Sequence, residues 1–117
     1  MNTTHFKCVS VSFVVDGCQI YFHNGEPEDD PESLEPYFLI QRLFEPPDDG
    51  SCYIETSDIE SCGHFHFREA ELSRNRLRLN TRGEFPRLFD VTFEANDRKF
   101  MAMRKALRSM IRRLVLK

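Results

Sequence analysis

The sequence predicts an α+β fold: a mostly antiparallel β-sheet meander of about seven strands, covered by one C-terminal amphipathic helix. Residues 76–80 and 89–94 alternate apolar and polar side chains, as expected of strands with one solvated face. Residues 97–115 repeat apolar side chains at spacings of three and four, which predicts a helix with one apolar stripe. The Asp16-Gly17 pair separates β-branched and aromatic runs and predicts a type I′ hairpin turn.

The predicted elements together make one domain spanning residues 1–117. Residues 37–44 are apolar on both faces up to Gln41-Arg42, as expected of a central strand covered on both sides. Asn96 or Asp97 is suited to cap the helix, and neither Pro nor Gly occurs from residue 95 to the end. The predicted strands are residues 7–15, 18–23, 37–44, 52–56, 64–72, 76–80 and 89–94.

Charge is distributed unevenly along the chain, although the whole protein has a net charge of only −3. Residues 26–60 hold twelve acidic residues and one arginine, a net charge of −11. Residues 97–117 hold eight basic residues and one aspartate, a net charge of +7. Either these regions neutralise each other within the fold, or one of them faces a charged partner.

The loop at residues 24–36 carries much of the acidic charge. It contains three prolines and six acidic residues, so it is predicted to form an open acidic loop outside the core. A second acidic turn follows at residues 45–50. Such loops either serve solubility or form a recognition surface for a basic protein, with nearby tyrosines as anchors.

The sequence indicates a cytoplasmic protein. It has no run of about eighteen apolar residues and no basic-then-apolar leader at its N-terminus, so we expect neither a membrane span nor a signal peptide. In the cytoplasm thiols stay reduced, and we expect no disulfides. The four cysteines are Cys8, Cys18, Cys52 and Cys62.

Metal binding and catalysis are both disfavoured by the motifs. Cys52, Cys62, His64 and His66 are suitable zinc ligands, but they lack the short Cys-Cys spacing of structural zinc sites, so we expect no metal. No nucleophile elbow or glycine-rich phosphate loop occurs. We therefore expect a protein that is not an enzyme and needs no cofactor.

Nucleic acid is an alternative partner. The basic helix, together with Arg74, Arg76, Arg78 and Arg82, could present a face to phosphates. The acidic segment would repel the same backbone, so nucleic acid is predicted to be an unlikely partner. The apolar stripe of the helix is better explained as the cover of the sheet than as a membrane contact.

Several stretches, in order, resemble one family. They are Tyr37-Phe38-Leu39-Ile40-Gln41-Arg42, Tyr53-Ile54-Glu55, the hairpin at residues 72–79, Val91-Thr92-Phe93, and the helix with Phe100, Leu107 and Ile111. Over residues 37–114 the chain resembles the Immunity protein 10 family of bacterial polymorphic toxin systems. The resemblance implies a non-catalytic cytoplasmic protein that binds and neutralises a cognate toxin and requires no cofactor.

The binding residues are our own hypothesis, because the resemblance carries none over. An acidic surface with tyrosine anchors would suit a basic toxin. We expect Gln41, Arg42 and Glu55 to form a structural polar network. The alternative is a nucleic-acid-binding or general protein-interaction module that uses the basic C-terminal helix. The predicted toxin-binding residues are Glu26, Glu28, Asp29, Asp30, Glu32, Tyr37, Asp48, Asp49 and Tyr53.

Overall fold

The computed structural model of the chain describes residues 4–25, 36–46 and 48–117. Within these residues the chain forms two five-stranded β-sheets and one α-helix, with a short 3-10 helix at Ile59–Ser61. The predicted α+β class is therefore confirmed. The single antiparallel meander of about seven strands is wrong. The described residues contain ten strands in two sheets, and one sheet is mixed.

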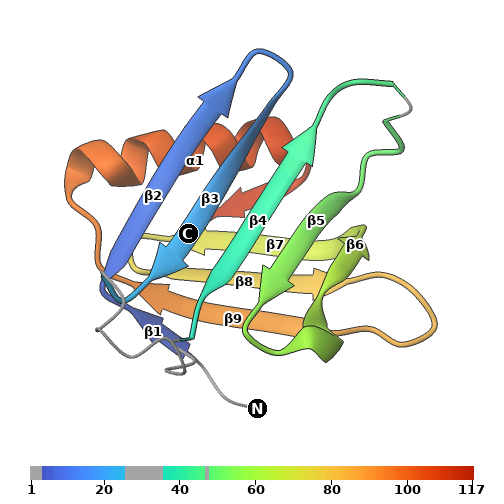
Figure 1. Cartoon of the computed structure of the whole chain (residues 1–117), viewed down its shortest axis with the longest axis horizontal. Coiled ribbons are helices and arrows are strands. Elements are labelled where there is room, and N and C mark those ends of the chain that lie inside the picture. Colours follow the sequence, from blue (N-terminus) through green and yellow to red (C-terminus); the bar gives the residue numbers. More distant parts are fainter. Residues whose placement is uncertain (1–3, 26–35, 47) are drawn as a thin grey trace.

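The first sheet is an antiparallel meander with the order β2-β3-β4-β5-β6 (Figure 1). Strands adjacent in the chain are hydrogen-bonded neighbours, so this part of the predicted meander is confirmed. The strand predicted at residues 37–44 lies at its centre, between β3 and β5. The bounds are β2 Cys8–Val14, β3 Gly17–His23, β4 Phe38–Leu43, β5 Cys52–Thr56 and β6 Gly63–Phe65.

The first hairpin turns one residue earlier than predicted. Val14 pairs with Gly17, so Val15 and Asp16 are the turn residues. Neither has a positive φ, and the predicted type I′ turn at Asp16-Gly17 is wrong. Gly17 serves a different purpose, because a Cβ at this position would lie 2.7 Å from the carbonyl oxygen of Arg42 on β4. The glycine therefore permits the close approach of β3 and β4.

The second sheet has the order β1-β9-β8-β7-β10 and mixes parallel and antiparallel neighbours. Its antiparallel centre consists of β7 (Phe67–Ser73), β8 (Arg76–Thr81) and β9 (Leu88–Phe93). The short strands β1 (Thr4–Phe6) and β10 (Leu114–Leu116) pair in parallel with β9 and β7. These two edge pairings make the sheet mixed.

The chain passes from one sheet to the other at two corners. Lys7 separates β1 from β2, and His66 separates β6 from β7. In Figure 1 the strands of the two sheets cross, as in orthogonal packings whose corners are made by strands that change sheets. The predicted strand at residues 64–72 is thus shared between both sheets, whereas the one predicted at residues 7–15 begins at a corner and forms only β2.

Helix α1 (Asp97–Met110) packs on β2 and β3, on the same side of the first sheet as the second sheet (Figure 1). Its start is as predicted, because Asn96 Oδ1 accepts a hydrogen bond from the Lys99 backbone N–H at 2.8 Å. The predicted end at residue 115 is wrong, since the helix stops at Met110 and residues 114–116 form β10. Ile111 is extended yet buried, so the apolar stripe continues into the core without being helical.

The core lies between the first sheet on one side and the second sheet with α1 on the other. The ring of Phe22 packs against Phe38 and Phe93, with ring centroids 5.7 Å and 5.6 Å apart. Each fully buried side chain of this size contributes about 1.5–3 kcal/mol through the hydrophobic effect. The largest fully buried side chains are Phe6, Phe22, Phe93, Ile20, Ile40, Ile54, Leu72, Leu77, Leu79, Met103, Leu107 and Met110.

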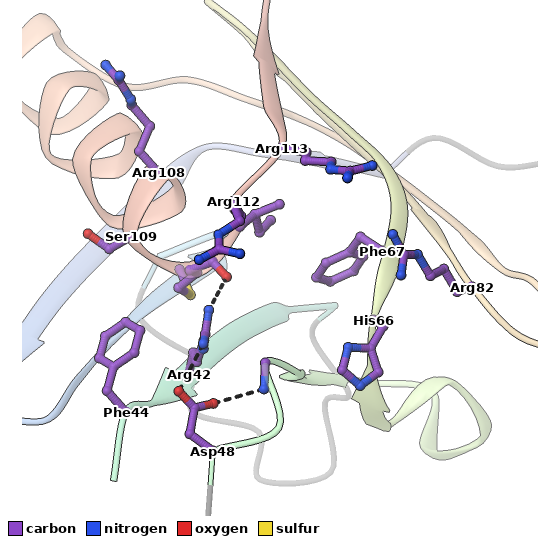
Figure 2. A pocket seen from close by; sticks show the side chains of 13 residues that line it. Arg42, Phe44, Asp48, His66, Phe67, Arg82, Arg108, Ser109, Arg112 and Arg113 are labelled. Atoms are coloured by element: carbon purple, nitrogen blue, oxygen red, sulfur yellow. Dashed lines mark hydrogen bonds and ion pairs between the residues drawn. The ribbon is translucent and has the colours of Figure 1, made fainter. Parts of the chain in front are cut away.

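Arg42 ties the end of α1 to the first sheet. It is on the inner face of β4, the same face as Ile40, and its Nη1 donates to the Met110 carbonyl oxygen at 2.8 Å (Figure 2). Its Nη2 donates to Asp48 Oδ2 at 2.9 Å. One side chain thus joins β4, the β4–β5 connection and the C-terminal end of the helix, where cations are favourable.

Candidate functional site

The outer face of the first sheet carries all three tyrosines of the protein. Ile20, Ile40 and Ile54 are fully buried on the inner face. Because side chains alternate along a strand, Tyr21 on β3 and Tyr53 on β5 point outward. Tyr37, just before β4, joins them: its ring lies 5.9 Å from that of Tyr21. We call Tyr21, Tyr37, Tyr53 and Glu55 the tyrosine face.

Glu55 organises this face. Its Oε2 accepts a hydrogen bond from Tyr37 Oη at 3.0 Å, and its Oε1 accepts one from Tyr53 Oη at 2.8 Å. Burial, with help from the Glu55 hydrogen bond, raises the pKa of Tyr37 to about 12. The hydrogen bond to Glu55 also raises the pKa of Tyr53. Both phenols therefore remain protonated donors at neutral pH, held in fixed orientations.

Two histidines extend the row of rings. His23 stacks on Tyr21, with centroids 4.9 Å apart, and His64 lies 5.3 Å from the ring of Tyr53. A band of aromatic rings therefore runs across β3, β4 and β5 to β6. Rigid aromatic side chains of this kind are typical anchors of protein interfaces.

An acidic hollow adjoins this band at the end of β4 and the start of β5. Its volume is about 510 Å³, and we define it by Glu45, Asp48, Asp49, Tyr53 and His64, which are among its lining residues. Three carboxylates line it against the single guanidinium of Arg42, which Asp48 already pairs. The remaining charge is negative, so the hollow suits a cationic side chain.

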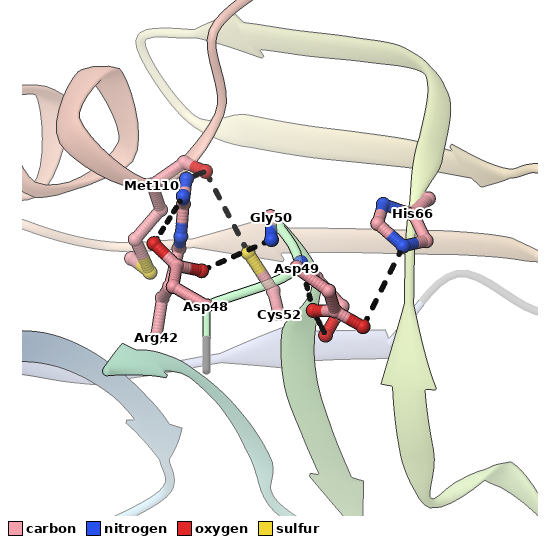
Figure 3. Close-up of polar contacts among 8 residues, drawn as sticks. Arg42, Asp48, Asp49, Gly50, Cys52, His66 and Met110 are labelled. Atoms are coloured by element: carbon pink, nitrogen blue, oxygen red, sulfur yellow. Dashed lines mark hydrogen bonds and ion pairs between the residues drawn. The ribbon is translucent and has the colours of Figure 1, made fainter. Parts of the chain in front are cut away.

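The two aspartates of the hollow have different roles (Figure 3). Asp48 is mostly covered: it pairs with Arg42 and accepts from the Gly50 backbone N–H at 3.0 Å. Asp49 has 73% of its side chain exposed, and its Oδ1 accepts from the backbone N–H and hydroxyl of Ser51. The hydrogen bonds from Arg42 and Ser51 lower the pKa of Asp48 and Asp49, respectively. Both are ionised at neutral pH, and Asp49, whose Oδ2 lies 3.9 Å from His66 Nε2, is the more exposed of the two.

The predicted toxin-binding residues are only partly brought together. Tyr37 and Tyr53 share Glu55, and Asp49 lies at the rim of the hollow beside Tyr53. Asp48 also lines the hollow, but its carboxylate is already paired with Arg42. The remaining predicted residues, Glu26, Glu28, Asp29, Asp30 and Glu32, lie outside the described residues.

The structure does not unite Gln41, Arg42 and Glu55 in one network. Gln41 and Glu55 are on the outer face of the first sheet, whereas Arg42 is on the inner face. Sequence reasoning missed Tyr21 and His23 as members of the outer face. The alternation of Ile20 and Phe22, both buried, was the signal that could have placed them there.

The four candidate zinc ligands are separated. Cys52 is in the core, where burial raises its pKa to about 12, and its Sγ lies 3.8 Å from the Met110 carbonyl oxygen. Cys62 Sγ contacts the Thr56 carbonyl oxygen. His64 lies beside the ring of Tyr53, whereas His66 lies near Asp49. Within the described residues, no three His, Cys, Asp or Glu side chains are grouped so that they could hold a metal ion.

No family model, curated protein or solved structure matches this chain. Among the described residues, no helix has the length and apolar character needed to cross a bilayer. The fold and the geometry of the tyrosine face and acidic hollow are therefore the structural basis for a functional proposal.

Proposed function

We propose that this chain is a non-catalytic immunity protein that binds and neutralises a cognate bacterial toxin in the cytoplasm. Its resemblance to the Immunity protein 10 family motivates the class of protein. The observation that carries the proposal is the acidic hollow beside the tyrosine face. Together they combine ionised carboxylates with fixed aromatic side chains on a sheet face that no other described element covers.

The chemistry of this surface suits a basic partner. Exposed carboxylates at Glu45 and Asp49 would accelerate encounter with a positively charged toxin through electrostatic attraction. A lysine or arginine of the toxin would enter the hollow and meet Asp49, while neighbouring apolar groups pack on Tyr53. The toxin would be inactivated by occupation of its basic surface.

The Glu55 contacts favour tight binding for a second reason. The hydroxyl groups of Tyr37 and Tyr53 are both held by one carboxylate, so these side chains lose less conformational freedom when a partner docks. Removing this constraint should raise the dissociation rate more than it changes the association rate, because preorganisation acts after encounter.

The proposal is tested by measuring association of the purified chain with the toxin encoded beside it. The variant carries Glu45→Lys and Asp49→Lys, which reverse two charges of the hollow. The control carries Glu60→Lys and Glu84→Lys, which reverse two exposed acids elsewhere and give the same net charge. We expect the hollow variant to associate about tenfold or more slowly at low salt and the control to change far less. Equal effects of both variants, or none, would reject the acidic hollow as the interface.

A further inference from the structure

A basic groove lies at the C-terminal end of α1 and shares Arg42 and Asp48 with the lining of the acidic hollow. Its volume is about 690 Å³, and five arginines are among its lining residues: Arg42, Arg82, Arg108, Arg112 and Arg113. Figure 2 shows Arg82 beside Phe67 and His66, on the side of the groove formed by β7 and the corner before it, and Arg112 above Arg42; the Arg108 side chain extends away from the other arginines. The groove thus collects residues from four separate parts of the chain.

The charge of this groove is uncompensated within the described part of the chain. Asp48 is the single carboxylate of the lining, and it is paired with Arg42. The other four arginines make no ion pair with any described residue. Mutual repulsion of four guanidinium groups is unfavourable, and an anion in the groove would relieve it.

Arg74, Arg76 and Arg78, in and beside β8 of the second sheet, provide a contrast. Arg76 and Arg78 both pair with Asp90 on the neighbouring strand, and Arg74 pairs with Asp97 at the start of α1. These three arginines are therefore matched by carboxylates, whereas Arg82, Arg108, Arg112 and Arg113 of the groove are not.

Aromatic side chains accompany the arginines. Phe44 and Phe67 line the groove with the imidazole of His66, and the guanidinium of Arg42 lies 5.0 Å from the centre of the Phe44 ring. Two N–H groups of one guanidinium can donate to two oxygens of the same phosphate, and aromatic rings can stack with nucleotide bases. Guanidinium groups next to flat rings therefore favour a ligand with both phosphates and a base.

The concave shape restricts how such a ligand is presented. The volume of the groove falls in the range of small-molecule sites, about 300–1,000 Å³. A protein reads duplex DNA by placing a protruding element in its groove, and here the arginines line a recess instead. A mononucleotide or an unpaired segment can enter a recess, whereas a duplex would have to stay outside.

We propose that the basic groove binds a phosphate ester of nucleotide size, either a free nucleotide or a segment of a single strand. Arg112 and Arg113 hold the phosphates from the side of the helix end. Arg82 does so from the side of β7, and the base stacks against Phe44 or Phe67. The groove shares Arg42 and Asp48 with the lining of the acidic hollow, but its four unpaired arginines do not line the hollow, and neither proposal depends on the other.

The test measures binding of two fluorescent probes to the full chain at several salt concentrations: a nucleoside triphosphate and a short single-stranded oligonucleotide. The groove variant carries Arg112→Gln and Arg113→Gln. The matched control carries Arg98→Gln and Lys99→Gln, two exposed basic residues in the first turn of the same helix. Circular dichroism and thermal unfolding establish that both variants keep the fold.

We expect the groove variant to bind both probes about tenfold or more weakly, while the control changes little. The slope of the logarithm of the binding constant against the logarithm of the salt concentration should decrease in magnitude by about two in the groove variant. If unlabelled triphosphate displaces the oligonucleotide, the ligand is a nucleotide; if the oligonucleotide binds and the triphosphate does not compete, the ligand is a strand. Absence of binding by either probe, or equal weakening by both variants, would overturn the proposal. Toxin protection by the groove variant is expected to be unchanged, so the two proposals fail independently.

Discussion

Replacing Arg42 with Met would test the connection between the end of α1 and the first sheet. The side chain is only 18% exposed and makes two charge-assisted hydrogen bonds, to the Met110 carbonyl and to Asp48. Methionine keeps most of the apolar stem but removes both hydrogen bonds. The Met110 carbonyl and the Asp48 carboxylate would then each lose a partner.

The expected magnitude follows from these contacts. Hydrogen bonds to charged groups contribute about 1.5–3 kcal/mol each to the free energy of unfolding. Two terms reduce the sum: Arg42 Nε is buried and has no partner among the described residues, and burying a guanidinium is itself unfavourable. We therefore expect a net loss of about 2 kcal/mol, or about 8 °C in the midpoint of thermal unfolding.

Urea unfolding followed by far-ultraviolet circular dichroism measures this loss. Asp48→Asn serves as the second arm of a double-mutant cycle. In the natural chain, Asp48→Asn should lower the free energy of unfolding by less than Arg42→Met does. In the chain that already carries Arg42→Met, Asp48→Asn should have almost no effect. A loss below about 0.5 kcal/mol for Arg42→Met, or the same Asp48→Asn effect in both chains, would refute the reasoning.

The same pair predicts how stability depends on pH. Because the Arg42 hydrogen bond lowers the pKa of Asp48 below 3.8, the folded state is stabilised above that value. The stabilisation is lost as the pH falls through the lowered pKa of the folded state. Unfolding curves of the natural protein and the Asp48→Asn variant should therefore converge in acid, and a constant difference from neutral to acid pH would contradict this assignment.

Three further predictions concern single positions. Gly17→Ala should destabilise by about 1–3 kcal/mol, measured by thermal unfolding, because the new Cβ meets the carbonyl oxygen of Arg42. Glu55→Gln should lower the pKa of Tyr37 from about 12 in an alkaline titration of tyrosinate absorbance, without removing the contribution of burial. The pKa of Tyr37 is about 12 in the folded state and about 10 in the unfolded state, so this tyrosine stabilises the folded state below about pH 10. That stabilisation should disappear as the pH rises toward 12. Cys52, buried and with a raised pKa, should react with thiol reagents only after unfolding.

The parts of the fold that sequence could predict depend on local patterns. The alternation around Leu77 and Leu79 placed both in the core, and the side chain of Asn96 capped the helix as expected. Tyr37 and Tyr53 were predicted from sequence to be binding anchors; the structure places both against Glu55, and their role in binding stays a prediction. The alternation and the helix cap are decided by residues a few positions apart, whereas the contact of Tyr37 with Glu55 spans 18 positions.

The parts that sequence could not predict depend on distant contacts. Phe65 and Phe67 keep the same alternation across His66, so the pattern contains no sign that the strand changes sheets there. The helix ends at Met110 because the next residues pair with β7, some forty positions earlier, and Arg42 binds the final carbonyl. The basic groove was missed because it combines the end of α1 with residues of three other segments.

Growth of a naive bacterial host tests the central claim most directly. The reading frame adjacent to this gene would be induced with and without the chain. The proposal predicts killing that the natural protein and the Glu60→Lys/Glu84→Lys control both prevent, and that the Glu45→Lys/Asp49→Lys variant prevents poorly. Killing that the natural protein does not prevent would contradict the immunity role, as would an adjacent product that causes no killing.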